Sequence, residues 1–562
     1  MVKVLVLGGY GVFGGRLCEL LAADPRLQLI ISGRSQAKAE AFCQGLDAAQ
    51  PAQALRFDRR GDAIEQLRRA APDLLIDASG PFQAYGERPY VLIEACLELA
   101  IDYMDFADGA EFVAGVARFD QAARQRGIVV LSGVSSFPVL SAAVLRRLTA
   151  DFSRVDQIYG GIAPSPFAGV GLNVIRAIAG YAGQPIALRR DGQQRIGYAL
   201  TETLDYRISP PGYLPLDRIR FSLVEVPDLQ VLPALWPEAN TVWMGAGPVP
   251  EILHRALNLL AGLVRWRLLP SLAPFAALFH FAINTLRFGA HRGGMFIEVQ
   301  GQTAAGRACT RSWHMVAEGD DGPYIPCMAL QALVLRLLAQ RRPAPGARAA
   351  SQDLEFEDYQ ALFAARRIVH GMRDSAEDSA QRPLFARLLG SAWDQLPAEL
   401  RSAHCFDHNM SLRGRAEVER GSGRLGRWLA DLFGFPRAGS DIEVEVDMQR
   451  CAEGERWQRC FAGRRFLSHL SAPQGRWRGL LCERFGPWRF AIALVWENHR
   501  LRYVVRHWAL LGLPLPSRWA PRGDSFEEIC AGRFHFDVEI ALPLVGRLVR
   551  YRGWLAALAA RP

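Results

Sequence analysis

The stretch MVKVLVLGGYGVFGGRLCELLA, residues 1–22, decides the fold of the N-terminal part of the chain. An apolar run at 4–7 meets a glycine-rich turn, and the turn leads into an amphipathic helix. Three glycines in this region, Gly8, Gly11 and Gly14, follow the spacing G-x-x-G-x-x-G. A strand, a tight glycine turn and a helix in this order are typical of the first unit of a dinucleotide-binding domain.

Each glycine of this turn has a separate steric role. Gly8 permits the sharp turn, Gly11 leaves room for a pyrophosphate at the backbone, and Gly14 lets the helix pack closely on the strand. Val12 and Phe13, between Gly11 and Gly14, are expected to bind the cofactor as well, because the free N–H groups at the start of the helix and its dipole favour a bound pyrophosphate. The alternative is a glycine-rich turn that binds nothing.

The end of the second strand, LQLIISGR at 27–34, indicates which cofactor is bound. In NAD-binding domains an acidic residue near this position binds the ribose 2′-hydroxyl. Here the sequence is Ser32-Gly33-Arg34-Ser35, and an arginine pairs with a 2′-phosphate that an acid would repel. We therefore expect NADP(H), with NAD(H) as the alternative. An ordinary solvated loop arginine is the other interpretation of Arg34.

The next two strands end in residues suited to the rest of a dinucleotide. Asp58 ends the third strand, where it can bind the adenine amino group or cap the next helix. The fourth strand, 73–82, ends in small residues, and these are Ala78, Ser79, Gly80 and Pro81. Small side chains there let the backbone approach the nicotinamide ribose. Strands and helices alternate throughout this region, which predicts a parallel, doubly wound sheet.

The run SGPFQAYGERPYVLIEACLELAIDYMDFADGAEF, residues 79–112, resembles the saccharopine-dehydrogenase-like oxidoreductases. The shared features are a G-P-F-x-x-Y-G motif, an alanine–cysteine pair and a Y-x-D strand. Together with GGYGVFG and SGR, the resemblance covers about residues 2–348 and implies a Rossmann domain followed by an α/β domain on the substrate side. Saccharopine enzymes carry an aspartate-proline-glycine element where this chain has GVSSFP at 133–138, so saccharopine is not the expected substrate.

Hydride transfer requires a proton donor close to the substrate, and two residues are candidates for this catalytic role. Tyr85 follows the fourth strand on the nicotinamide side, and Asp105 ends the fifth strand at the same edge of the sheet. Tyr85 can instead pack the loop, and Asp105 can cap the next helix. The sequence shows no Ser-Tyr-Lys arrangement of the kind typical of short-chain reductases.

The whole sequence predicts an α/β chain with three domains. Residues 1–142 form the Rossmann domain, and residues 143–352 form an α+β domain for substrate binding and dimerisation. Residues 353–381 are expected to be a linker with some helix, and residues 382–562 a mostly antiparallel β domain.

Several shorter patterns describe the middle domain. Two alternating runs joined at 304–306 predict a hairpin, QPIALRRDGQQRIGY at 184–198 predicts one strand, and RRPAPGARAA at 341–350 predicts the exit from the domain. The uncharged segment 268–286 is marginal as a membrane-spanning helix, because prolines, a histidine and an asparagine interrupt it. It is expected to be a helix pair buried in the domain or at a homodimer interface. The alternative is a hydrophobic lid or a shallow, peripheral membrane contact.

Residues 382–555 resemble an uncharacterised domain that is often fused to saccharopine-dehydrogenase-like proteins, through runs such as GRAEVERG, ERFGPWRF and FDVEIALPLVGRLVRYRGWL. Short alternating runs predict an antiparallel sheet curved around a pocket, with a helix against it. Such an aromatic-rich sheet is suited to a hydrophobic ligand. The acidic residues that alternate at 417–419 and 443–447 are expected on a solvated or pocket-facing side, and HCFDH at 404–408 is expected to be a loop, so no metal site is predicted.

Composition restricts the function further. The net charge of +9 comes from arginines mixed with acidic residues, so we predict no nucleic-acid-binding patch. Ten cysteines without a C-x-x-C pair, and a strand at the N-terminus that leaves no room for a signal peptide, indicate the cytoplasm or the inner face of a membrane. We expect an NADP(H)-dependent oxidoreductase that acts on a small molecule. An apolar substrate would fit the interpretation of 268–286 as a hydrophobic lid or membrane contact. The rivals are an NADP(H)-binding scaffold or sensor and a membrane-associated lipid-handling protein.

Overall fold

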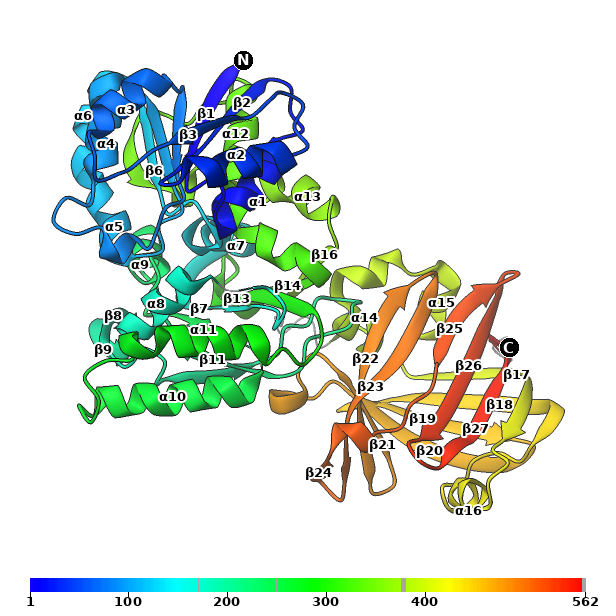
Figure 1. The fold of residues 1–562 in the computed structure, drawn as a ribbon. Helices are drawn as coiled ribbons and strands as arrows, with labels where there is room; N and C mark the ends of the chain where they lie inside the picture. Colours follow the sequence, from blue (N-terminus) through cyan, green and yellow to red (C-terminus); the bar gives the residue numbers. More distant parts are fainter. Residues whose placement is uncertain (170, 249, 375–380, 558–562) are drawn as a thin grey trace. The chain divides into compact units, whose positions relative to one another are not determined.

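The structure is a computed structural model that describes residues 1–169, 171–248, 250–374 and 381–557 (Figure 1). The chain divides into two compact units, and each is described by itself. One consists of Met1–Tyr206 with Ile219–Val369, and the other of Arg207–Arg218 with His370–Pro562. The short segment 207–218 therefore belongs with the C-terminal unit, although it lies within the predicted middle domain. The predicted domain boundaries themselves stay predictions.

A seven-stranded parallel sheet forms the N-terminal part of the first unit. Its strands in spatial order are β15 (Gly346–Ala349), β6 (Val129–Ser132), β5 (Asp102–Asp105), β4 (Leu74–Asp77), β1 (Val2–Leu7), β2 (Leu27–Gly33) and β3 (Gln53–Arg56). The order reverses between β1 and β4, and this is the point where ligands bind in doubly wound sheets. The predicted Rossmann arrangement is confirmed.

Helices cover both faces of this sheet, as Figure 1 shows. They include α1 (Val12–Leu21), α2 (Gln36–Gly45), α3 (Ala63–Ala70), α4 (Val91–Leu99), α5 (Ala110–Gly115) and α6 (Asp120–Arg126). The next helix, α7 (Ser141–Leu148), packs instead against strands of the mixed sheet described below. Because both faces are covered, the strands are buried on both sides, and the run from Val4 to Leu7 has almost no exposed surface.

The chain returns to the parallel sheet after it has formed the middle region. Strand β15 pairs with β6, and helix α12 (Ile325–Leu338) packs against α1. Residues 341–350, predicted to be the exit from the middle domain, thus also contain a strand of the parallel sheet that was not predicted. Strand β15 is four residues long and has the sequence GARA, which carries no pattern of a strand, so only its pairing partner makes it one.

A mixed seven-stranded sheet follows, in agreement with the predicted α+β region. Its strands in spatial order are β10 (Thr203–Tyr206), β11 (Ile219–Leu223), β12 (Thr241–Ala246), β7 (Phe152–Ala163), β13 (Arg292–Thr303), β14 (Ala308–Glu318) and β16 (Ile368–Asp374). The helices of this region are α8 (Leu172–Tyr181), α9 (Asp228–Leu235), α10 (Glu251–Arg265), α11 (Ala276–Thr285) and α13 (Glu357–Ala364). The predicted hairpin is confirmed, because β13 and β14 pair antiparallel.

Two stretches of this region differ from their predictions. Residues 184–198 form a hairpin of β8 (Pro185–Arg190) and β9 (Gln193–Tyr198) rather than one strand. The turn is Asp191-Gly192, and both residues have positive φ, so the Asp-Gly pair was the signal for this hairpin. The stretch expected to be a linker with some helix contains the helix α13, but it also contains β16, the edge strand of the mixed sheet, which was not predicted.

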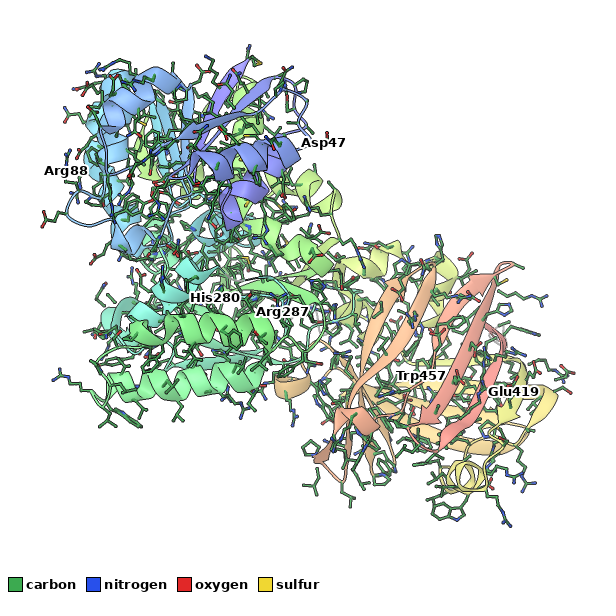
Figure 2. The ribbon with its side chains drawn as sticks, in the orientation of Figure 1. Asp47, Arg88, His280, Arg287, Glu419 and Trp457 are labelled. Carbon is green, nitrogen blue, oxygen red and sulfur yellow. The ribbon has the colours of Figure 1, made fainter. Side chains whose placement is uncertain are left out.

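The apolar segment 268–286 is not a helix pair buried within its domain. It forms α11 and a short turn of helix before it, and Figure 2 labels His280 and Arg287 in this region. One face packs against α8, but Leu278 and Phe281 are 60% and 66% exposed. No helix among the described residues is long and apolar enough to cross a membrane. The homodimer and the shallow membrane contact stay predictions.

The second unit contains an eleven-stranded antiparallel sheet that closes on itself, because β22 pairs with both β21 and β23. In spatial order its strands are β22 (Trp488–Glu497), β21 (Leu481–Phe485), β20 (Arg464–Ser471), β19 (Gly454–Phe461), β18 (Gly439–Cys451), β17 (Asn409–Arg420), β27 (Gly546–Ala557), β26 (Arg533–Leu542), β25 (Phe526–Cys530), β23 (Arg500–Leu510) and β24 (Leu513–Leu515). Helices α14 (Leu384–Leu389), α15 (Ala398–Ala403) and α16 (Arg424–Leu432) accompany it. The predicted curved antiparallel sheet is confirmed, whereas β25 was not predicted.

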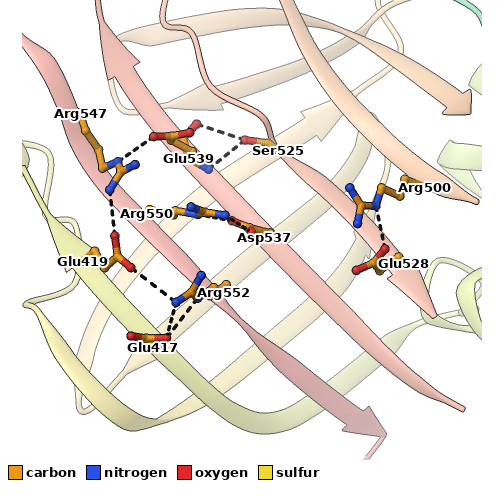
Figure 3. A network of polar contacts seen from close by, with 10 residues as sticks. All are labelled: Glu417, Glu419, Arg500, Ser525, Glu528, Asp537, Glu539, Arg547, Arg550 and Arg552. Carbon is orange, nitrogen blue, oxygen red and sulfur yellow. Dashed lines mark hydrogen bonds and ion pairs between the residues drawn. The ribbon is translucent and has the colours of Figure 1, made fainter. Parts of the chain in front are cut away.

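The two faces of the closed sheet have opposite chemistry. Apolar side chains point inward, and charged side chains form ion pairs across neighbouring strands on the outside (Figure 3). Glu417 and Glu419 of β17 contact Arg552 and Arg547 of β27, and Asp537 pairs with Arg550 at 2.6 Å. The alternating acids therefore belong to the outer, solvated face, which was one of the two expectations for them.

Candidate functional site

The glycine-rich turn between β1 and α1 has no room for side chains. Gly8 has a φ of +80°, a conformation that favours glycine. A Cβ atom at Gly14 would lie 2.3 Å from the carbonyl oxygen of Gly8, and one at Gly11 would lie 2.9 Å from the same atom. Helix α1 thus begins directly against the end of β1, as the glycine spacing predicts.

The N-terminus of α1 faces the crevice between β1 and β4. The first intrahelical bond runs from the N–H of Gly15 to the carbonyl oxygen of Gly11 at 2.9 Å, so the preceding helical N–H groups have no partner within the helix. Gly11 and Val12 are exposed, and Phe13 is half-buried. On the other side of the crevice, a Cβ at Gly8 would be 2.7 Å from the carbonyl oxygen of Ala78. This geometry fits a pyrophosphate.

The loop after β2 presents a free guanidinium group. Arg34 is exposed and forms no hydrogen bond or ion pair within the described part of the chain. Ser32 is buried, and its hydroxyl donates to the carbonyl oxygen of Val6 at 3.0 Å, so it ties β2 to β1. The hydroxyl of Ser35 accepts from the backbone N–H of Lys38 and caps α2.

Tyr10 was not predicted from the sequence as part of this site. Its hydroxyl accepts a hydrogen bond from the backbone N–H of Ser35 at 3.1 Å. A Cβ at Gly33 would lie 2.5 Å from the Tyr10 hydroxyl, so Gly33 is needed to let the ring pack there. Tyr10 fixes the loop that carries Arg34. An aromatic residue within the glycine turn itself is the signal that could have indicated this role.

Asp58 does not cap the helix that follows it. The side chain of Asp62 accepts from the backbone N–H of Glu65 and caps α3, whereas Asp58 accepts from the backbone N–H of Arg60 at 3.1 Å. The cap alternative is therefore wrong, because the cap lies four residues later. Contact with adenine stays a prediction.

A polar cluster lies at the end of β4. The buried carboxylate of Asp77 accepts hydrogen bonds from the Ser79 hydroxyl at 2.6 Å and from the Tyr85 hydroxyl at 2.9 Å. The guanidinium of Arg59 lies 3.4 Å from the centre of the Tyr85 ring. Burial and the neighbouring Asp77 raise the pKa of Tyr85 further above its ordinary value, so its proton stays on the hydroxyl. In this structure Tyr85 packs the loop and holds Asp77.

Asp105 ends β5 next to this cluster and is completely buried. Its Oδ1 accepts from the N–H groups of Ala107 and Gly133, and from the Ser132 hydroxyl, at 2.8–3.0 Å. Its Oδ2 has no hydrogen-bond partner among the described residues. Burial raises the pKa of Asp105 to about 7, with a smaller contribution from the charge of Asp77. A carboxyl group that titrates near neutral pH is typical of functional sites.

The middle region adds side chains to the edge of the parallel sheet. The Nδ2 of Asn173, on α8, donates to the carbonyl oxygen of Gly80 at 3.3 Å. Gln83 donates to Asp108 at 3.1 Å, and Glu225 accepts from the N–H of Ala110 at 3.0 Å. No pattern in the sequence indicates Asn173 or Glu225, because only the fold brings them beside the strand ends.

The histidines of HCFDH do not share a site. His404 is buried and its Nε2 is 2.7 Å from Glu527, whereas His408 is exposed. Among the described residues, no group of three or more histidine, cysteine, aspartate or glutamate side chains is arranged to hold a metal ion.

Two segments of the chain match known sequence families. Residues 4–131 match the saccharopine dehydrogenase NADP binding domain, and residues 396–555 match a domain of unknown function, DUF4166. Both resemblances inferred from the sequence are thereby confirmed, each for its own part of the chain. Among proteins with curated functions, none matches this sequence.

Similar solved structures include several dehydrogenases. Apo saccharopine dehydrogenase (L-Glu forming) from Saccharomyces cerevisiae has a TM-score of 0.48 at 13% identity and covers 67% of this chain and 100% of its own. A mutant meso-DAPDH from Clostridium tetani has a TM-score of 0.32 at 13% identity, with 64% and 96% covered. GenD2 from gentamicin A biosynthesis, in complex with NAD, has a TM-score of 0.31 at 12% identity, with 61% and 88% covered.

Proposed function

We propose that this chain, whose residues 4–131 match the saccharopine dehydrogenase NADP binding domain, is an NADP(H)-dependent oxidoreductase of the dehydrogenase type. The observation that carries the proposal is the glycine turn, in which Gly8, Gly11 and Gly14 exclude any side chain beside the exposed start of α1. Such a turn at the point where the strand order reverses is the dinucleotide site of doubly wound sheets.

Different residues at this edge of the sheet would bind different parts of the cofactor. The N–H groups at Val12, Phe13 and Gly14 would hold the pyrophosphate, and Arg34 would pair with the 2′-phosphate. The backbone from Ala78 to Pro81 would lie beside the nicotinamide ribose. When bound, the nicotinamide supplies the hydride.

Asp105 is the better placed of the two predicted catalytic residues. Its carboxyl group can gain or lose a proton near neutral pH, and its Oδ2 has no partner within the described structure. It is buried, so proton transfer to a substrate requires a rearrangement of the strand ends around it. The Tyr85 hydroxyl donates a hydrogen bond to Asp77, and we propose that Tyr85 positions the loop rather than the substrate.

The chemistry beside the strand ends restricts the substrate. The carboxyl groups of Glu225, Asp108 and Glu111 lie near one another there, and the pKa of Glu225 is raised by burial and also by the charges of Asp108 and Glu111. A substrate with several carboxylates would be repelled. We propose a neutral or cationic substrate, and this agrees with the expectation that saccharopine is not the substrate.

The experiment is a fluorescence titration of the full chain with NADPH and with NADH. Arg34→Ala is expected to weaken NADPH binding by about tenfold to a hundredfold and to change NADH binding by less than about threefold. Arg26→Ala is the matched control, because Arg26 is an exposed arginine immediately before β2, at the opposite end of the same strand. Absence of binding by either nucleotide would contradict the proposal.

A scaffold or sensor that binds NADP(H) without turnover is the second candidate. It is favoured by the complete burial of Asp105 and by the hydrogen bond that occupies the Tyr85 hydroxyl. Oxidation of bound NADPH by a panel of neutral and amine-containing carbonyl compounds separates the two. Turnover that is lost in Asp105→Asn, with NADPH binding retained, supports the enzyme.

A further inference from the structure

The closed sheet of the C-terminal unit surrounds a large apolar cavity. The cavity has a volume of about 480 Å³, which lies in the range of small-molecule sites. Aromatic side chains from many strands line it, including Phe461, Phe466, Trp488, Phe490, Trp508 and Phe536. In small closed sheets the side chains fill the interior, so a cavity of this size indicates room for a ligand.

Residues on β26 show that this space lies inside the sheet. Asp537 and Glu539 point outward, where they pair with Arg550 and Arg547. Val538 lies between them and must point inward, since side chains alternate along a strand. Val538 is nevertheless only half-buried, and it lines the cavity, so its exposed surface faces the cavity.

A few polar side chains interrupt the apolar lining. Arg459 and Glu483 approach to 3.4 Å, and Arg459 also donates to the Ser468 hydroxyl at 2.8 Å. His404 and Glu527, at 2.7 Å, form a second pair that lines the same cavity. Each charge near the cavity thus has a polar partner within the protein.

One nitrogen of the His404 ring has no hydrogen-bond partner among the described residues. Because Nε2 lies against the Glu527 carboxylate, the proton of the neutral ring belongs on Nε2. The Nδ1 atom is then an acceptor, and it is buried without a partner among the described residues. A hydroxyl group can satisfy it by donating a hydrogen bond.

One end of the closed sheet is apolar on its surface. Helix α16 directs Leu429 toward the cavity and leaves Leu425, Trp428 and Leu432 exposed. The turns after β23 and β26 lie at the same end and expose Leu511 and Leu544. Cavity residues such as Leu542 and Trp508 adjoin these turns, so this end is a route by which an apolar molecule can reach the interior.

We propose that the closed sheet binds an uncharged, long-chain apolar molecule that carries a single hydroxyl group, with the chain in the aromatic cavity and the hydroxyl group at His404. The paired charges in the cavity favour an uncharged ligand, because a carboxylate would have to separate Arg459 from Glu483 and approach Glu527. The proposal is independent of the cofactor site.

Fluorescence titration of the full chain with all-trans-retinol tests the proposal. Retinol is an apolar chain with one hydroxyl group, and energy transfer from cavity tryptophans such as Trp457 and Trp488 reports its position. We expect a Kd of about 1–10 μM, and binding of all-trans-retinoic acid, which differs only in its head group, weaker by at least about fivefold. NADPH binding to the same sample shows that the rest of the chain is intact.

Matched variants locate the site. Val538→Trp fills the cavity and is expected to weaken retinol binding by at least about tenfold, with Val538→Phe as the smaller change should the first variant not fold. Glu443→Trp adds the same bulk to the outer face of β18 and is expected to change the Kd by less than about twofold. The proposal is overturned by three results: no retinol binding by the wild type, equal effects of the inner and outer variants, or tighter binding of retinoic acid than of retinol.

Discussion

The parallel sheet and the closed antiparallel sheet put their candidate sites in different places. In β1 the run from Val4 to Leu7 is buried on both faces, so the sheet has no free face and its site lies at the strand ends. In β18 apolar residues such as Val444 and Val446 alternate with acidic residues, so the sheet has one apolar face that encloses a cavity. The burial pattern of the strands therefore decides whether the binding site lies at the edge of the sheet or in its interior.

The two sites also rely on different residue types. At the edge of the parallel sheet, glycine backbone and a few fixed polar groups form the site, and Gly14 cannot gain a single carbon atom. Inside the closed sheet, large aromatic side chains form the site, and the cavity still has space. Small changes should therefore damage the first site more than the second.

The largest effect is expected at the glycine turn. In Gly14→Ala the new Cβ would lie 2.3 Å from the Gly8 carbonyl oxygen, so we expect a loss of about 3 kcal/mol in the free energy of unfolding of this domain and no NADPH binding. Thermal unfolding and the NADPH titration measure both. Gly45→Ala is the control, because a Cβ there meets no atom within 4 Å and should leave both properties unchanged. If Gly14→Ala and Gly45→Ala had the same stability and the same NADPH affinity, the glycine turn would not be more sensitive to small changes than the closed sheet.

A smaller effect, on membrane binding, is expected for variants of α11. The apolar side chains of this helix are exposed to solvent, whereas those of the closed sheet line an internal cavity. If this face contacts anionic membranes, Leu278→Ser/Phe281→Ser should lower the affinity for vesicles with an anionic lipid by about tenfold or more. Co-sedimentation with the vesicles measures this. Ile196→Ser, on β9, is an equally exposed control in the same unit. Absence of vesicle binding by the wild type contradicts the membrane contact.

The buried carboxyl group at the edge of the parallel sheet predicts a pH dependence. Asp105 has a pKa of about 7 when folded, against about 4 in an unfolded chain, so the folded state holds the proton more tightly. Its contribution to stability is present at low pH and is lost as the pH rises from about 4 to about 7, by about 1 kcal/mol per pH unit. The Tm of the wild type should therefore fall more steeply between pH 5 and pH 7.5 than the Tm of Asp105→Asn. If Tm fell equally steeply with pH in the wild type and in Asp105→Asn, Asp105 would not titrate in this pH range.

The smallest effect is expected on the outer face of the closed sheet. Arg547→Ala removes ion pairs with Glu419 and Glu539, and these groups are partly exposed (Figure 3). We expect a loss of less than about 1 kcal/mol in the free energy of unfolding, and unchanged retinol binding, because solvent screens such pairs. Denaturant unfolding measures the first. A loss as large as that of Gly14→Ala would mean that the outer face is as critical as the glycine turn.

The sequence predicted the parallel sheet well because its signals are local. The apolar run at 4–7, the glycine spacing and the alternation of strands and helices each act within about twenty residues. The same holds for the hairpin of β13 and β14 and for the alternating strands of the closed sheet. Closure of that sheet was not predictable from the sequence. It requires β22 to pair with β23 and also every neighbouring pair of strands from β22 through β21 round to β23 to form.

The parts that the sequence did not predict depend on contacts between distant segments. β15 is a strand because β6 lies beside it, and 207–218 belongs to the C-terminal unit, where the N–H of Trp496 donates to Gly212 at 2.8 Å. At the candidate site, Tyr10, Asn173 and the hydrogen bond from Tyr85 to Asp77 depend on tertiary geometry. The positions of Arg34 and Asp105 at strand ends were predictable because each directly follows or ends a strand.

The most direct test of the proposed cofactor site is a crystal structure of the full chain with NADPH bound. We expect the pyrophosphate at the N–H groups of Val12 and Phe13, and the 2′-phosphate within hydrogen-bonding distance of Arg34. A dinucleotide bound elsewhere, or bound in this crevice with its 2′-phosphate away from Arg34, would contradict the proposed cofactor site.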